Sequence, residues 1–81
     1  MNINIEETVK GMFSELLDID CAKIKNDLLL IEDLAIDSFG FAELSFIVKE
    51  KFNFEISTED TQGIKTVNDL ICYIKNNLGR E

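Results

Sequence analysis

Residues 38–52, SFGFAELSFIVKEKF, decide how this chain folds. At the 100° steps of an α-helix, four apolar residues share one narrow face, namely Phe41, Leu44, Val48 and Phe52. Such a stripe is typical of a helix that packs against a core. Asp37 suits the N-cap, because its carboxylate can accept a hydrogen bond from a first-turn backbone N–H. We therefore predict a helix from Ser38 to about Phe52.

The opposite face of this helix carries a different pattern, made of Phe39, Glu43, Phe46 and Glu50. Exposed phenylalanines that alternate with glutamates, on a helix that already has a core stripe, indicate a partner-binding surface. The alternative is that the long connection before the helix covers the two aromatic rings. We favour the partner-binding interpretation.

Upstream, residues 4–17 form a second amphipathic pattern. Its apolar residues recur at steps of three and four: Ile5, Val9, Met12, Phe13 and Leu16. Asn4 suits the N-cap, so we predict a helix over residues 4–17. Residues 18–36 have no sustained period, and a connection this long is unusual in a compact domain. Its scattered leucines indicate that it is held against the core.

Downstream, Ser57 to Asp60 have the form of a capping box that opens a short helix, and Thr66 to Asp69 repeat the signal. A clean apolar stripe follows, made of Val67, Leu70, Ile71, Ile74 and Leu78, with Gly79 placed to end the helix. The predicted fold is all-α. It is a small bundle of three longer helices plus one short helix, with a long loop between the first and second helices. With 81 residues, the chain is expected to be a single domain spanning 1–81.

Composition narrows the function. Sixteen acidic residues against eight basic ones give a formal net charge of −8, which disfavours nucleic acid and anionic membranes as partners and favours basic protein surfaces. The chain has no histidine, which removes the commonest general base and metal ligand. Its two cysteines, Cys21 and Cys72, match no zinc spacing, and free thiols are the expectation. No signal-peptide pattern and no membrane-spanning apolar run occur, so a cytoplasmic monomer without membrane insertion is expected.

Ser38 is the candidate site residue. It stands at the junction of the long loop and the helix, where first-turn N–H groups favour a phosphate. On local grounds alone, a serine beside a helix start is usually only a cap. No histidine can activate it as a hydrolytic nucleophile, so no catalytic residue and no metal site are predicted. If Ser38 is covalently used, another enzyme must activate it.

The sequence around Ser38 resembles a known family. Residues 32–39, EDLAIDSF, look like the modification motif of acyl carrier proteins, whose core is Asp-Ser followed by a large apolar residue. The resemblance continues through Glu43-Leu44, residues 50–56 and residues 64–70, and so covers nearly the whole chain. It implies a non-enzymatic carrier. Coenzyme A donates 4′-phosphopantetheine to Ser38 through a phosphopantetheinyl transferase, and the arm then holds acyl groups as thioesters for fatty acid or polyketide-type biosynthesis.

The resemblance also implies roles for neighbouring residues. Asp37 matches the acid of the motif and would cap and orient the modification site. Phe39, Glu43, Phe46 and Glu50 match the docking face, with Ile56 near its far edge. Partner enzymes of the family, such as an acyltransferase, ketosynthase or ligase, dock on this face with basic patches, and the acyl chain can retreat into the bundle core.

Four residues depart from the common pattern of the family: Ala35 for Gly, Gly40 for an acid, Lys49 for an acid and Ser57 for Pro. These departures leave the pathway open. A D-alanyl or other aminoacyl carrier remains an alternative, because Asp-Ser-Phe-Gly resembles that class as well. An unmodified acidic interaction module is the third possibility. One structural check is that Cys72 should be exposed, because it points away from the apolar stripe of the last helix.

Overall fold

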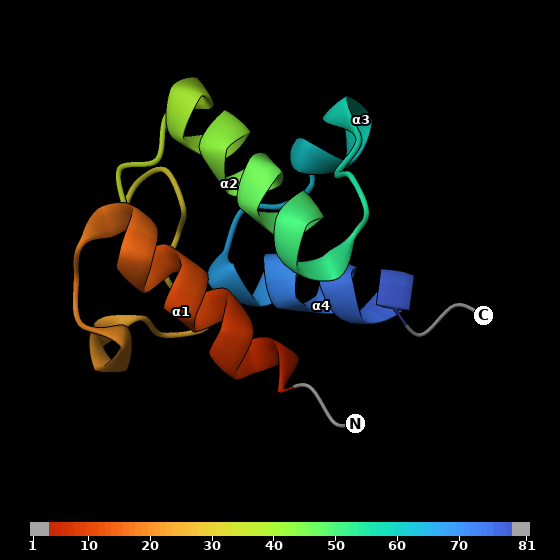
Figure 1. Ribbon diagram of the computed structural model, residues 1–81. Helices are drawn as coiled ribbons and strands as arrows, with labels where there is room; N and C mark the ends of the chain where they lie inside the picture. The colour runs from red at the N-terminus through yellow and green to blue at the C-terminus, as the bar shows by residue number, and fades with distance from the viewer. Residues whose placement is uncertain (1–3, 79–81) are drawn as a thin grey trace.

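The computed structural model describes residues 4–78, apart from the side chain of Thr58, and shows an all-α fold in that part of the chain (Figure 1). The helices are α1 (Ile5–Leu17), the 3₁₀ helix η1 (Cys21–Lys23), α2 (Ser38–Phe52), α3 (Thr58–Thr61) and α4 (Val67–Leu78). The prediction of three longer helices, one short helix and a long loop before α2 is confirmed. The single turn η1, which lies inside that loop, was not predicted.

Side-chain caps explain where the helices begin. In three of them the residue before the first turn accepts a backbone N–H from three residues further on. These bonds run to Asn4 from Glu7 at 3.1 Å, to Asp37 from Gly40 at 2.8 Å and to Ser57 from Asp60 at 3.1 Å. Each bond satisfies a backbone donor that has no partner inside its helix. The predicted caps at Asn4, Asp37 and Ser57 are confirmed.

The start of α4 is a reciprocal capping box. Thr66 Oγ1 accepts the N–H of Asp69 at 3.0 Å, and Asp69 Oδ2 accepts the N–H of Thr66 at 3.2 Å. The same carboxylate oxygen also accepts the N–H of Lys65 at 3.1 Å. The segment that leads into α4 is therefore held by three bonds to local side chains. The predicted stop at Gly79 lies outside the described residues.

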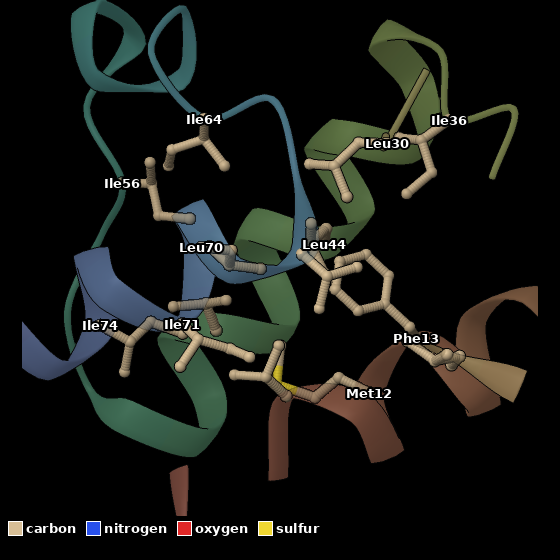
Figure 2. Close-up of a cluster of buried hydrophobic side chains, with 14 of the residues drawn as sticks. Met12, Phe13, Leu30, Ile36, Leu44, Ile56, Ile64, Leu70, Ile71 and Ile74 are labelled. Atoms are coloured by element: carbon tan, nitrogen blue, oxygen red, sulfur yellow. The ribbon is translucent and has the colours of Figure 1, made fainter. Parts of the chain in front are cut away.

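The core is formed by the predicted stripes of α1, α2 and α4. α1 packs against both α2 and α4, and α3 lies on the side of the molecule away from α1 (Figure 1). Within the described part every buried side chain is apolar, and Met12, Phe13, Leu44, Leu70 and Ile71 meet at its centre (Figure 2). Four residues of the predicted stripes are only half-buried: Ile5, Leu16, Phe41 and Leu78.

The long loop between α1 and α2 is held against this core, as its leucines predicted. Ile24, Leu30 and Ile36 are almost fully buried. The N–H of Leu30 donates to the carbonyl of Lys65 at 2.9 Å, and the N–H of Val67 donates to the carbonyl of Leu28 at 3.1 Å. These two bonds flank an isolated antiparallel bridge between Leu29 and Thr66. The loop is therefore tied to the segment that precedes α4.

Candidate functional site

Ser38 is the first residue of α2, and its side chain is exposed. Asp37 stands before it in an extended conformation, with φ −96° and ψ −171°. Asp37 Oδ1 accepts the N–H of Gly40 at 2.8 Å, and its carbonyl accepts the N–H of Phe41 at 2.8 Å. Two bonds from one residue fix the first turn of the helix. The hydroxyl of Ser38 is thus presented to solvent from a rigid helix start, with the Asp37 carboxylate beside it.

The loop side of Ser38 is equally constrained. Ile36 is 3% exposed, and its N–H donates to the carbonyl of Leu30 at 2.9 Å. Just before it, Ala35 adopts the left-handed conformation with φ 57°, and its N–H donates to the carbonyl of Ile31 at 3.1 Å. This tight turn reverses the chain and directs it into α2. Ser38 is therefore positioned by a buried anchor two residues away.

A cleft of about 510 Å³ lies next to Ser38, between α2, the long loop and the α3 segment. Phe41, Ile56 and Ile64 contribute apolar surface to it, and Ile56 and Ile64 point into the core cluster beside Leu70 (Figure 2). Polar residues also line it, namely Glu32, Ser45, Thr61, Gln62 and Lys65. The cleft therefore combines apolar walls with polar groups, directly beside the exposed hydroxyl.

The outer face of α2 matches the sequence pattern. Phe39 is 73% exposed and Phe46 is 62% exposed, and Glu43 and Glu50 are exposed as well. The loop leaves both aromatic rings uncovered. Ile31, at 68% exposure, is a further apolar side chain on the surface, and the sequence pattern did not single it out. Because the loop has no periodic pattern, the sequence does not indicate which of its side chains are exposed.

Ile56, expected near the far edge of the docking face, lines the hollow beside Phe46 and Lys49 at that end of α2. It is only 9% exposed, however, and belongs to the core cluster. The segment between α2 and α3 folds back against the bundle, which turns Ile56 inward. Ile56 therefore lines the cleft beside Ser38 instead of offering an exposed contact.

An ion pair marks the far end of α2. Lys49 Nζ donates to Glu55 Oε2 at 2.7 Å, which joins the helix to the segment that leads to α3. The Lys49 ammonium lowers the pKa of Glu55, first by the hydrogen bond and then by its charge, and the pKa of Lys49 is raised for the same two reasons. A second hollow of about 310 Å³ lies here, lined by Ala42, Ser45, Phe46, Lys49, Glu55 and Ile56.

Residues 4–78 contain no group of three or more Cys, Asp or Glu side chains placed to hold a metal ion, and none of their helices is long and apolar enough to cross a membrane. Cys21 and Cys72 are both free and exposed, which confirms the prediction for Cys72.

Comparisons of this chain with a family model, with known sequences and with solved structures all point to one family. The family model described as "phosphopantetheine attachment site" matches residues 7–74. The acyl carrier protein of Chlamydia caviae is 40% identical over 77 residues, which cover 95% of this chain and 100% of that protein. The acyl carrier protein of Buchnera aphidicola subsp. Acyrthosiphon pisum (strain Tuc7) is 45% identical over 76 residues, covering 93% and 95%. The solved acyl carrier protein of Enterococcus faecalis superposes with a TM-score of 0.76 at 30% identity, covering 90% of this chain and 92% of that one.

Proposed function

Because this chain belongs to the acyl carrier proteins, we propose that its phosphopantetheine arm is attached through the hydroxyl of Ser38. The chain is a carrier and not an enzyme, and 4′-phosphopantetheine is its prosthetic group. The arm supplies the thiol that holds acyl intermediates as thioesters.

The exposed hydroxyl of Ser38 at a rigid helix start is the observation that carries the proposal. A phosphodiester at this place would lie at the N-terminus of α2, where the helix dipole favours negative charge. Asp37 keeps its carboxylate bonded to the N–H of Gly40 and thereby holds the turn in shape. The cleft beside Ser38 offers apolar surface from Phe41 and Ile64 against which an attached acyl chain can pack.

Modification needs help from another protein. A serine hydroxyl is a weak nucleophile unless a base removes its proton, and the chain contains no histidine. A phosphopantetheinyl transferase would therefore supply the base and take the arm from coenzyme A. Because Ser38 is exposed at one corner of the bundle, the transferase can reach it without any unfolding of the carrier.

Partner enzymes would dock on the outer face of α2. Glu43 and Glu50 supply negative charge for basic patches, while Phe39 and Phe46 supply apolar contact area. Exposed charge of this kind accelerates encounter more than it strengthens the complex. That suits a carrier, which must bind and leave many enzymes in turn. We place this exchange in the cytoplasm, since two exposed free thiols suit a reducing compartment.

The cargo we favour is an acyl chain of fatty acid or polyketide-type biosynthesis. The apolar walls that Phe41, Ile56 and Ile64 give to the cleft support it, because burial of methylene groups stabilises a hydrocarbon cargo by roughly 0.8 kcal/mol per group. An aminoacyl cargo, whose polar ammonium would gain little from such walls, is the alternative. Loading assays with malonyl and D-alanyl donors would separate the two.

Intact-mass spectrometry tests the attachment site. The parent protein is incubated with coenzyme A, Mg²⁺ and a broad-specificity transferase, beside Ser38→Ala and the control Ser45→Ala. Ser45 lies on the same helix and lines the same cleft, but it is half-buried. We expect one phosphopantetheinyl increment on the parent and on Ser45→Ala, and none on Ser38→Ala. An increment that persists on Ser38→Ala would overturn the assignment.

A further inference from the structure

The outer face of α2 is divided by charge along its length. Around the start of α2 three acidic side chains stand, Glu32 in the loop, Asp37 at the cap and Glu43 in the second turn, and one lysine, Lys65, lines the cleft beside Ser38. At the far end two lysines, Lys49 and Lys51, stand against two glutamates, Glu50 and Glu55, so that four charges sum to zero. A surface that is acidic at one end and mixed at the other does not fit a uniformly basic partner.

At the far end of α2, the ammonium of Lys49 has a defined ion-pair partner. Its contact with Glu55 at 2.7 Å uses one of the three N–H donors of the ammonium. The side chain remains 56% exposed and borders the hollow of about 310 Å³. Donors at the rim of a hollow can meet an acceptor that enters from outside.

The same hollow has an apolar wall. Phe46 lines it and is 62% exposed, and Ala42 and Ile56 complete the apolar lining. An exposed aromatic ring beside a concave surface is the arrangement that a partner's apolar side chain fills, because both then leave water. Apolar and cationic groups thus face the same small space.

The spacing makes the two ends distinguishable to a partner. Lys49 follows Glu43 by six positions, which is a rise of about 9 Å along a helix. This is close to the distance over which physiological salt screens exposed charges, about 8 Å. A partner must therefore match the two ends separately, and a basic residue placed opposite Lys49 would be repelled.

We infer that the far end of α2 docks a partner-enzyme surface with two features. An apolar side chain of that surface enters the hollow beside Phe46, and a carboxylate meets the Lys49 ammonium. A basic residue of the same surface meets Glu43. This inference rests on the proposed function, since it concerns the enzymes that act on the carried acyl group. A partner surface whose charged residues were all basic would not match this arrangement.

A charge swap tests it without a change in net charge. Lys49→Glu/Glu55→Lys exchanges the two partners of the ion pair, so the pair can still form while the ammonium moves to the other side. The control is Glu6→Lys/Lys10→Glu, which exchanges the ion pair of α1, 3.2 Å apart and outside the α2 face. Each holo carrier is loaded with the same acyl group and assayed for kcat/KM with the elongating ketosynthase of its own genome.

We expect the α2 swap to lower kcat/KM about fivefold, since one attraction is lost and one repulsion is gained at an exposed site. The α1 swap should stay within about twofold of the parent, and 0.5 M salt should remove most of the difference. An unchanged or faster reaction of the α2 swap would overturn the inference. Intact mass of the parent checks the arm beforehand: a missing arm refutes the proposed function, whereas a loaded arm with an unchanged α2 swap refutes only the docking inference.

Discussion

Ala35→Gly should stabilise the protein, although it removes a side-chain methyl group. Ala35 has φ 57°, in the left-handed region, where an L-residue with a Cβ is disfavoured by about 1–2 kcal/mol. Glycine has no such penalty but loses more backbone freedom on folding, at a cost of about 0.5–1 kcal/mol relative to alanine. Because Ala35 is exposed, the loss of its methyl group removes little buried apolar surface. The net expectation is a gain of about 0.5–1 kcal/mol in the free energy of unfolding.

Urea unfolding followed by far-UV circular dichroism measures this change. For a domain of this size, 1 kcal/mol corresponds to a shift of roughly 4–8 °C in Tm, so a thermal melt is an independent check. The m-value should stay the same, because the surface exposed on unfolding does not change.

Two other positions provide matched controls for Ala35→Gly. Asp18 and Asn53 are the other non-glycine residues of the described part with positive φ, at 57° and 64°. Asp and Asn are several-fold enriched in this conformation, so Asp18→Gly and Asn53→Gly should gain less than Ala35→Gly. A lower midpoint for Ala35→Gly, or an equal gain at Asn53, would refute the reasoning from backbone strain.

Two further changes test other parts of the structure. Tyr73→Phe should flatten the loss of stability at alkaline pH, because burial and the hydrogen bond of its hydroxyl to Asp60 at 2.8 Å raise the pKa of Tyr73. The neutral tyrosine is the stabilising form, so its contribution is complete below the ordinary pKa of about 10 and is lost as pH rises through the raised value. Urea midpoints at about pH 8 and pH 11 measure this, and equal alkaline losses in parent and variant would contradict it. Gly11→Ala should raise the free energy of unfolding by about 1 kcal/mol, since a Cβ there meets nothing within 4 Å inside α1. Gly40→Ala should gain less, because its Cβ would lie 3.4 Å from Asp37 Oδ1 and Ile36 Cγ2, and a larger gain at Gly40 would show that this contact is harmless.

The helices and their faces could be predicted because their signals are local. The stripe that contains Leu44 and Val48 depends only on the 3.6-residue period, and both side chains are fully buried. The capping box at Thr66 and Asp69 depends on residues three positions apart, and both of its bonds form. Ser38 was singled out by its motif and by its place at a helix start, and the structure leaves it exposed there.

The long loop could not be traced from the sequence, because its position depends on contacts between distant residues. Leu30 is buried and Ile31 is exposed although both are large and apolar, and the N–H of Leu30 is bonded to the carbonyl of the distant Lys65. No periodic signal in residues 18–36 distinguishes the two. The left-handed turn at Ala35 was not predicted for a different reason, namely that alanine seldom marks such a turn.

The sequence by itself therefore determined the helices, their buried stripes and the serine at the start of α2, since these follow from residues one or two turns apart. Only the tertiary structure decided what surrounds that serine. It turned Ile56 inward to line the cleft and brought Ile64 and the loop to the same space. At the far end of α2 it also paired Lys49 with Glu55. In each of these contacts the helix packing determines how close the two segments lie. Helix packing in turn depends on all the side chains of the core.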